Sequence, residues 1–358
     1  MKTKIKGISL FSSAGIGEYF LSRIGIKIVA ANEIIPKRAD LYRKIYPEHK
    51  MITGDIKNKE VFDELLNIAL KNNVGFLLAS PPCQGISVAG KNRNIYNMAH
   101  DERNYLIMYV INMIKKVKPT YVLIENVPLL LKLQLYINGE LKPIVDIIKD
   151  EFSLEYNINF DILDAADYGT PQKRKRAIIR LNKKGTIWNL PQKQPLISVR
   201  QAIGDLPSLE SGEESSLKWH YGRVHAPEQI KWMKHTPTGK SAFENIEHYP
   251  RKINGERIKG YNSSYRRIYW DEPAPTITIR NDAISSQRNV HPGRCLPDGT
   301  FSDARVLSIL ELIRLTGLPD NWRIPDNTPE ILIRQILGEC IPPLLIENIT
   351  REIFNEEN

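Results

Sequence analysis

The residue with the clearest potential for chemistry is Cys83. It follows an apolar run (residues 74–79) and the dipeptide Pro81-Pro82, and Gln84-Gly85 comes directly after it. Proline fixes the backbone and lacks an amide hydrogen, so a strand ends here and the thiol is presented in a turn. Most lone cysteines are small buried hydrophobes, but these flanking residues favour an exposed and reactive thiol. The pattern predicts a cysteine nucleophile.

A second candidate is Glu125, which ends another apolar run of strand length (residues 121–124). A carboxylate at the tip of a buried strand costs free energy unless it is paired or functional. Open α/β sheets place their chemistry at the carboxyl ends of parallel strands, so we expect Glu125 on the same sheet edge as Cys83. A solvated surface carboxylate is the alternative, and we consider it the weaker one.

A third group is Gln172, Arg174 and Arg176, which alternate with lysines before the apolar residues 177–181. Residues two apart on a strand share a face, so these three side chains are predicted to point the same way. Cations on one face can hold an anionic or polar ligand. A solvated, basic edge strand is the alternative interpretation.

The beginning of the chain is typical of a nucleotide-binding fold. Residues 5–11 predict a strand, residues 12–17 are mostly small, and residues 18–23 predict a helix. A second strand (residues 26–31) leads to Glu33, which can accept hydrogen bonds from both hydroxyls of a ribose. A short strand (residues 51–53) then precedes Asp55. Taken singly, each acid could be a solvated surface charge, but their order after alternating strands favours binding.

Composition narrows the class of protein. The 358 residues include 42% hydrophobic and 25% charged residues, as expected of a globular chain able to bury a sizeable core. The formal net charge of +9 favours a polyanionic partner. The three cysteines lie far apart, which predicts a reducing compartment, no disulfide framework and no metal site. The chain shows neither a signal peptide nor an apolar run of membrane-spanning length, so we expect a cytoplasmic protein.

The predicted elements change in character along the chain. Up to residue 181, strands alternate with helices at 36–46, 59–71, 101–118 and 144–148, and a strand is expected at 153–163. Beyond it come a short helix at 199–207, a region at 217–288 in which aromatic and basic residues interleave, a helix at 303–319 and a last helix opening at 335–343. We therefore predict an α/β fold with a catalytic and cofactor-binding domain (1–185), a smaller irregular domain (186–290) and a return segment (291–358).

The motifs Ser80-Pro-Pro-Cys-Gln-Gly85, Glu125-Asn-Val127 and Gln172-x-Arg-x-Arg176 resemble, in order, those of the cytosine-C5 DNA methyltransferases. The resemblance covers nearly the whole chain outside the irregular region. It implies a Rossmann-like, S-adenosyl-L-methionine-dependent methyltransferase sheet with a target-recognition domain. It also implies a DNA (cytosine-5-)-methyltransferase, and the compact size resembles a prokaryotic restriction-modification methylase. The implied partners are double-stranded DNA and a cognate restriction endonuclease, and the implied state is a monomer.

The resemblance also assigns residues. It implies catalytic roles for Cys83, Glu125, Arg174 and Arg176; cofactor contacts from Phe11, Ser13, Gly15, Ile16, Glu33, Ile34, Asp55, Ile56, Pro82, Glu339 and Cys340; and DNA contacts from Gln84, Ser87, Lys91 and Arg93. The chain departs from the family pattern at Ser13 and Ile16, where glycines are usual, and at Glu339, where asparagine is usual.

Three other classes are compatible with part of the pattern. A tRNA cytosine-C5 methyltransferase would share Cys83 and the cofactor motifs, but the long irregular region argues against it. A non-catalytic DNA-binding protein would not need Cys83, Glu125 and Arg176 together. A Rossmann oxidoreductase fits only the opening strand, loop and Glu33, and leaves the later motifs unexplained.

Overall fold

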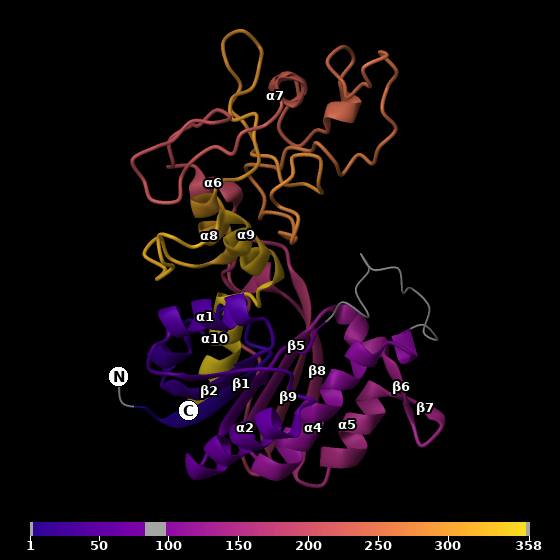
Figure 1. The fold of residues 1–358 in the computed structure, drawn as a ribbon, viewed down its shortest axis with the longest axis vertical. Helices are drawn as coiled ribbons and strands as arrows, with labels where there is room; N and C mark the ends of the chain where they lie inside the picture. The colour runs from indigo at the N-terminus through magenta and orange to yellow at the C-terminus, as the bar shows by residue number, and fades with distance from the viewer. Residues whose placement is uncertain (1–2, 83–97, 356–358) are drawn as a thin grey trace. The chain divides into compact units, whose positions relative to one another are not determined.

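The computed structural model describes residues 3–82 and 98–355 of the chain. Contacts divide the chain into two compact units (Figure 1). The sheet unit comprises Met1–Asp164, Lys175–Lys193 and Ile341–Asn358, and the loop-rich unit comprises Ala165–Arg174 and Gln194–Cys340. The boundaries of the three predicted domains, after residues 185 and 290, concern function. This division by contacts does not test them, and they stay a prediction.

A seven-stranded sheet organises the sheet unit (Figure 1). In spatial order the strands are β3 (Lys50–Thr53), β2 (Ile26–Glu33), β1 (Ile5–Leu10), β4 (Phe76–Ala79), β5 (Tyr121–Asn126), β9 (Lys175–Lys183) and β8 (Tyr156–Asp164). Strands β1 to β5 run parallel, whereas β9 is antiparallel to both of its neighbours. The strand order reverses between β1 and β4. In open α/β sheets, ligands bind at the carboxyl ends of the strands at such a reversal.

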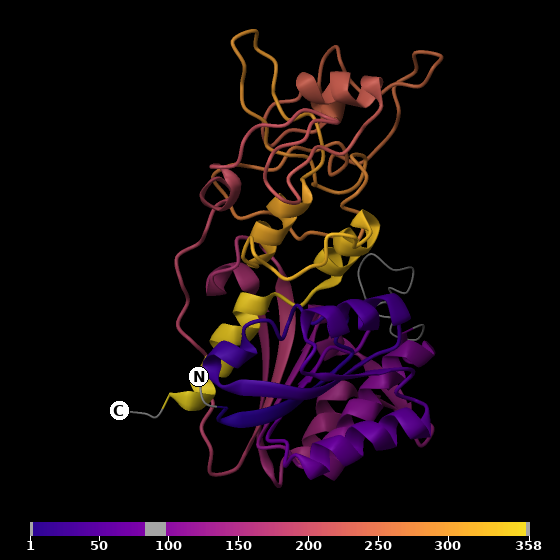
Figure 2. The same cartoon turned by 60° about the vertical axis from the view of Figure 1, so that its left-hand side comes forward.

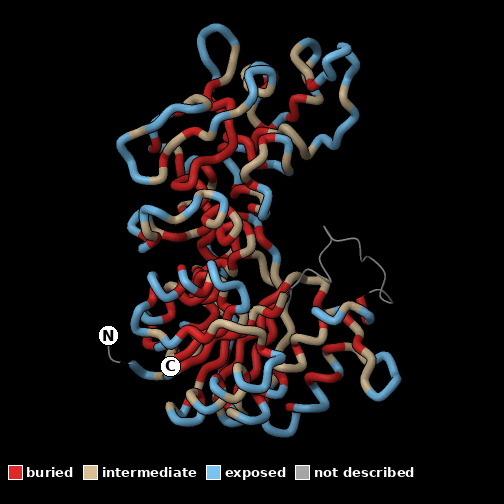
Figure 3. The backbone as a smooth tube through the Cα atoms, in the orientation of Figure 1, coloured by how far each residue is buried: buried red, intermediate tan, exposed pale blue. Residues whose placement is uncertain are grey.

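The central strands are buried along their whole length, and this is why their sequences are continuous apolar runs (Figure 3). Helices α2 (Lys59–Lys71), α4 (Leu106–Val117) and α5 (Ile144–Phe152) pack against them in one apolar cluster (Figure 2). The amphipathic α2 begins where the side chain of Asn58 accepts a hydrogen bond from the amide of Glu60. Helices α1 (Pro36–Ile45) and α10 (Pro343–Arg351) complete the unit.

The loop-rich unit contains helices α6 (Val199–Ile203), α7 (Pro227–Lys234), α8 (Ile309–Thr316) and α9 (Glu330–Glu339). Among its described residues, β pairing occurs only as isolated bridges. Its small apolar cluster includes Trp232, Met233 and Val290. Helix α8 is capped at both ends: Ser308 and Glu311 form a capping box, and Gly317 ends the helix with a φ of 86°. The unit therefore depends on caps, turns and side-chain hydrogen bonds more than on a ladder.

The predicted α/β class is confirmed, and so are most elements of the sheet unit, including α1 and α2. The predicted helix at 18–23 is wrong, because only a 3-10 turn (Leu21–Ile24) forms there. The predicted strand at 172–176 is also wrong in part. Strand β9 begins at Lys175, so Gln172 and Arg174 precede it and do not share a strand face with Arg176.

Three further differences concern helices and a hairpin. The helix expected at 303–319 is shorter and starts only after its serine cap. Residues 335–343 are expected to open the last helix. Instead they contain the end of α9, at Glu339, and the last helix, α10, begins only at Pro343. The sequence analysis missed the hairpin of β6 (Gln134–Ile137) and β7 (Glu140–Pro143), as well as α7. Within the described residues, no helix is long and apolar enough to span a membrane.

Candidate active site

Glu125 lies at the carboxyl end of β5, where both of its oxygens are held. Arg176 Nε is 2.6 Å from Oε1, and Ser80 Oγ donates to Oε2 at 2.8 Å. The side chains of Glu125 and Arg176 are only 5% and 12% exposed. A carboxyl group that is fixed by two donors in a sheltered position has a defined orientation.

The strand registers bring these residues together. Ala79 of β4 lies beside Ile124 of β5, so the next residues, Ser80 and Glu125, are neighbours. The antiparallel pairing of β5 with β9 places Asn126 opposite Ala177, next to Arg176. Sequence analysis predicted Glu125 and Arg176 in this site but missed Ser80. Its position directly before the Pro-Pro-Cys segment was the available signal.

The segment that leads to the predicted nucleophile is anchored at the same edge. Asn126 Nδ2 donates to the carbonyl oxygen of Pro81 at 2.8 Å, and Asn126 Oδ1 accepts from the amide of Val127. Pro82 is partly buried. Cys83 follows directly in the chain, but Cys83, Gln84, Ser87, Lys91 and Arg93 lie outside the described residues.

The loop after β1 has the backbone geometry of a ligand-binding turn. Phe11, Ser13 and Gly15 all have positive φ values, of 60°, 50° and 77°. A Cβ atom at Gly15 would lie 2.4 Å from the ring of Tyr46, so the residue must be glycine. The loop packs so closely on α1 that only its other side can receive a ligand.

Glu33, at the end of β2, supports this loop. Its Oε2 accepts from the amide of Ser13 at 2.9 Å, and its Oε1 accepts from the amide of Ile35 at 2.8 Å. Each carboxylate oxygen can accept a further hydrogen bond, so Glu33 can still bind ligand hydroxyls. The neighbouring Ile34 is 54% exposed and offers an apolar surface beside the carboxylate.

The remaining predicted cofactor residues of the sheet unit differ in exposure. Asp55 follows β3, and its carboxylate accepts from the amide of Lys57 while its side chain stays partly exposed. Ile16 and Ile56 are buried, so their side chains serve packing and only their backbones are suited to a ligand contact. Ser13 Oγ is buried and has no hydrogen-bond partner among the described residues. This unpartnered hydroxyl lies near the carboxylate of Glu33 at the end of β2. Such a pair of polar groups fits a nucleoside-type ligand.

Sequence analysis missed a buried acid in this loop, Glu18. Burial raises the pKa of its carboxyl group to about 7, although hydrogen bonds with Ser9 and Ser12 act in the opposite direction. Its Oε1 has no hydrogen-bond partner among the described residues. No periodic pattern marks Glu18, because the segment is not a helix. It lies in the loop where the ligand is expected.

The structure assigns Gln172 and Arg174 to the loop-rich unit, where both are buried. Arg174 donates to the carbonyl oxygens of Ile277, at 2.9 Å, and Gly338, at 3.0 Å. Gln172 accepts from the amide of Ile277 and donates to the carbonyl of Leu315. Both side chains therefore tie distant loop segments together.

Glu339 and Cys340 also belong to the loop-rich unit, at the end of α9. Cys340 is buried, and its thiol donates to the carbonyl of Leu337 at 3.2 Å. This contact fits a structural role. The described residues contain no cluster of three or more His, Cys, Asp or Glu side chains that could hold a metal ion.

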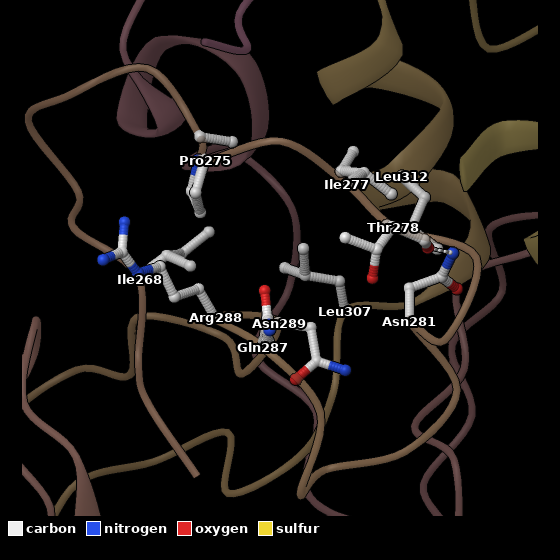
Figure 4. A pocket seen from close by; sticks show the side chains of 11 residues that line it. Ile268, Pro275, Ile277, Thr278, Asn281, Gln287, Arg288, Asn289, Leu307 and Leu312 are labelled. Atoms are coloured by element: carbon white, nitrogen blue, oxygen red, sulfur yellow. Dashed lines mark hydrogen bonds between the residues drawn. The ribbon is translucent and has the colours of Figure 1, made fainter. Parts of the chain in front are cut away.

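The loop-rich unit contains a small, mainly apolar pocket of its own (Figure 4). Its lining includes Ile277, Leu307 and Leu312, with the polar side chains of Thr278 and Asn281 at one side. None of the predicted site residues lines it. Glu125, Arg176, Glu33 and the loop after β1 belong to the sheet unit, whereas Gln172, Arg174, Glu339 and Cys340 belong to the loop-rich unit.

This site and fold match a known family. The C-5 cytosine-specific DNA methylase family model matches residues 5–355. The chain therefore belongs to this family, and it is a DNA cytosine-5 methyltransferase.

Individual relatives agree with this assignment. The chain is 77% identical over 356 residues to the Type II methyltransferase M1.HgaI of Avibacterium volantium, covering 99% of this chain and 100% of the relative. It is 28% identical to the Type II methyltransferase M1.HphI of Haemophilus parahaemolyticus, covering 97% and 86% of the two chains.

Solved structures show the same fold. A variant of Spodoptera frugiperda DNMT2 superposes with a TM-score of 0.63 at 16% identity, covering 98% of this chain and 100% of that one. The Entamoeba histolytica methyltransferase EhMeth gives 0.63 at 15% identity, covering 99% and 98%. At these identities the likeness concerns the fold alone, which is the Rossmann-like methyltransferase fold predicted from the sequence.

Proposed function

We propose that the protein methylates carbon 5 of a cytosine that is flipped out of duplex DNA, through a transient covalent bond to Cys83. The proposal is carried by the way Glu125 is held. Arg176 and Ser80 fix its carboxyl group at the carboxyl end of β5, and Ser80 directly precedes the Pro-Pro-Cys segment. A fixed carboxyl group beside a cysteine nucleophile is what addition to a pyrimidine ring requires.

Carbon 5 of cytosine is a poor nucleophile, because it belongs to an aromatic ring. The Cys83 thiolate adds to carbon 6, and Glu125 donates a proton or hydrogen bond at N3 while it contacts the exocyclic amine. This converts carbon 5 into an enamine-like nucleophile. After methylation, water takes the proton from carbon 5, and the C5–C6 double bond re-forms as the carbon–sulfur bond breaks. Cys83 leaves as a thiolate, and N3 returns its proton to Glu125. Arg176 is suited to the O2 atom of the ring.

The residues after β1, β2 and β3 would hold S-adenosyl-L-methionine. Glu33 would accept hydrogen bonds from the ribose hydroxyls, Asp55 would bind the adenine amine, and the loop containing Ser13 and Gly15 would bind the amino-acid portion. When bound, the cofactor supplies an electrophilic methyl group. Phe11, Ile34 and Pro82 would contribute apolar contacts, and Ile16, Ile56, Glu339 and Cys340 would contribute through backbone or neighbouring atoms.

The target carbon is inaccessible in a stacked duplex, so the base must leave the helix at a cost of a few kcal/mol. Gln84, Ser87, Lys91 and Arg93 would contact the DNA backbone and offset this cost. Arg174 would act as a brace, and its buried hydrogen bonds to two backbone carbonyls support that role. The net charge of +9 suits a polyanionic substrate.

The relatives named above support a wider role. Both are Type II methyltransferases, and we infer that this chain protects DNA in a restriction-modification system, with a cognate endonuclease acting on the same site. Such an enzyme would act in the cytoplasm as a monomer.

Replacement of the nucleophile tests the mechanism. Cys83→Ser should abolish methylation of duplex DNA while DNA binding persists, because serine cannot supply a thiolate. Cys295→Ser is the matched control, since Cys295 is an exposed free cysteine of the loop-rich unit, and it should retain activity. Mass spectrometry of the enzyme trapped on 5-fluorocytosine DNA should place the adduct on Cys83. An adduct on another residue, or normal turnover by Cys83→Ser, would contradict the proposal.

A further inference from the structure

An exposed hairpin in the loop-rich unit has a composition that the catalytic mechanism does not explain. Arg251 and Arg257 pair across it as an antiparallel bridge. Lys252 and Glu256 continue the pairing, with a backbone hydrogen bond of 2.8 Å and an ion pair. Gly255 closes the turn with a φ of 85°. The tip is therefore a built turn, and it projects from the unit (Figure 2).

At the tip stands Ile253, whose exposed fraction reaches 110%. Single exposed apolar residues are normal on protein surfaces, so exposure alone means little. Tight turns, however, favour Gly, Asn, Asp and Ser, and a β-branched side chain held out at the apex of such a turn gains nothing from the folded protein. A contact outside the chain would account for it.

The two arginines below the tip are held in fixed positions. Their guanidinium carbons lie 4.8 Å (Arg251) and 4.2 Å (Arg257) from the ring centre of Tyr249. Arg251 donates to the carbonyl oxygen of Glu247 at 2.7 Å, and Arg257 donates to that of Asn245 at 3.1 Å. The hairpin thus presents two cations that are both oriented by the ring of Tyr249.

The charge identifies the kind of partner. Residues 247–261 contain four cations, Arg251, Lys252, Arg257 and Lys259, and two acids, Glu247 and Glu256. A second hairpin of the same unit pairs Cys295 with Phe301, and its turn contains the acid Asp298. The 251–257 hairpin joins a fully exposed apolar tip to a cationic stem, a combination that fits a phosphate backbone with stacked bases between the strands.

We propose that Ile253 is a wedge that enters the stacked bases of the DNA substrate while Arg251, Lys252 and Arg257 contact the adjacent phosphates. The proposal rests on the proposed function, since it takes duplex DNA as the substrate. A wedge unstacks a base step, and an unstacked step lowers the cost of extruding a base. The stacked arginines keep the hairpin rigid, so little ordering entropy is lost on insertion.

The methylated site is first identified by bisulfite sequencing of DNA from cells that express the protein. The first test then compares the binding of Ile253→Ala and Arg251→Gln to a duplex that carries this site. Ile253→Ala should weaken binding about 50-fold, because three buried carbons are lost, and should leave the salt dependence of binding unchanged. Arg251→Gln should also weaken binding but should lower the slope of log affinity against log salt by about 1. The side chain of Ile253 is fully exposed, so Ile253→Ala should unfold like the wild type. Arg251→Gln loses the contacts with Tyr249 and Glu247 and should be slightly less stable, which its denaturation curve measures.

The matched control is Leu154→Ala. Leu154 is equally apolar and highly exposed, but it precedes β8 at the sheet edge opposite Glu125, so its removal should not change DNA binding. A second measurement follows 2-aminopurine placed along the duplex. Wild-type protein should raise its fluorescence at one step, and Ile253→Ala should abolish this rise.

The wedge proposal would be overturned if Ile253→Ala bound the duplex with unchanged affinity, or if it still raised the 2-aminopurine fluorescence. The partner of the exposed tip would then be a protein. Methylation by the wild type is measured in parallel. If the wild type fails to methylate duplex DNA, the proposed function fails. If it methylates normally and Ile253→Ala does the same with full affinity, only the wedge fails.

Discussion

In the sheet unit, backbone N–H and C=O groups pair along strands, whereas in the loop-rich unit buried arginine side chains take up many of the carbonyls. The strands of the sheet bury aliphatic side chains on both faces. In the loop-rich unit, the three largest fully buried side chains are Arg267, Arg305 and Arg334. The two units therefore satisfy the same requirement, that buried polar groups be hydrogen-bonded, by different means.

Arg267 shows how this works. Its guanidinium group donates to the carbonyl oxygens of Met233 and His291, each at 2.9 Å, and of Asp303 at 3.1 Å. These carbonyls come from helix α7 and from two separate loop segments. A guanidinium group offers five N–H donors in one plane, so a single side chain replaces several rungs of a ladder. Lysine, with a compact and rotating ammonium, is not an equivalent substitute.

Arg305 combines this role with charge pairing. It donates to the carbonyl of Leu209 at 2.8 Å, and it contacts the carboxylates of Asp303 and Glu311, each at 2.9 Å. All three charged side chains are buried. Irregular loops can therefore have a fixed interior when buried cations and acids are distributed among them.

The largest expected effect is on the rate of methyl transfer, and it comes from a residue of the sheet unit. Glu125→Gln should slow methyl transfer at least about 100-fold, because the amide cannot donate a proton to the ring, while affinity for duplex DNA is retained. Single-turnover kinetics and equilibrium binding measure the two quantities. Glu155→Gln, at an exposed ion pair with Lys118 in the same unit, is the control and should leave both unchanged. A normal rate for Glu125→Gln would remove this residue from the mechanism.

The next prediction concerns the buried cluster. Arg305→Met should destabilise the loop-rich unit by about 3–5 kcal/mol, because the buried carboxylate of Glu311 loses its arginine partner and that of Asp303 keeps, among the described residues, only Arg294 as an arginine partner. Urea unfolding followed by tryptophan fluorescence reports on this unit. Four of the five tryptophans belong to it: Trp219, Trp232, Trp270 and Trp322.

Arg200→Met provides the contrast for that experiment. Arg200 pairs with Asp271 at 2.6 Å in the same unit, but both side chains are more than half exposed, so stability should change little. Equal effects of the two substitutions would show that the buried cluster does not support the unit in the way described.

The third and smallest effect is an opposite pH dependence of the two units. In the sheet unit, burial raises the pKa of Glu18 to about 7, above its unfolded value of 4.5. The folded state therefore binds more protons, and stability falls as pH rises from 4.5 to 7, by about 3 kcal/mol in total. In the loop-rich unit, burial lowers the pKa of His291 to about 4, below 6.5. There, stability falls as pH drops from 6.5 to 4.

Glu18→Gln separates these contributions. The variant should be more stable than the wild type above pH 7 and indistinguishable from it below pH 4.5, since protonated glutamate and glutamine are both neutral. Denaturant midpoints measured at pH 5, 6, 7 and 8 give the comparison. A stability difference that does not change with pH would mean that Glu18 acts through packing rather than through its charge.

Much of the sheet unit could be predicted because its signals are local. Residues 76–79 and 121–124 are continuous apolar runs, as expected of buried parallel strands, and Glu125 stands out at the end of the second. Ser80 was missed as its partner because the two are 45 residues apart and meet only through strand register. The helix predicted at 18–23 did not form, since the loop after β1 continues through Glu18.

The loop-rich unit could not be predicted to the same depth. The alternation of Gln172, Arg174 and Arg176 is typical of a strand, but the first two residues are held by Ile277, more than 100 residues away. Periodicity does not report such contacts. The interior around Arg267 and Arg305 gave no apolar pattern at all, because its organisation depends on donors and acceptors that come together only in three dimensions.

Helix α10 has a consequence for the order of synthesis. It packs in the sheet unit, where Trp188 donates to the carbonyl of Ile349 at 2.8 Å and Glu347 pairs with Arg23. Arg23 thus waits for a partner that is translated more than 300 codons later. The nascent chain cannot assemble a finished methyl-transferring core on the ribosome until α10 has emerged.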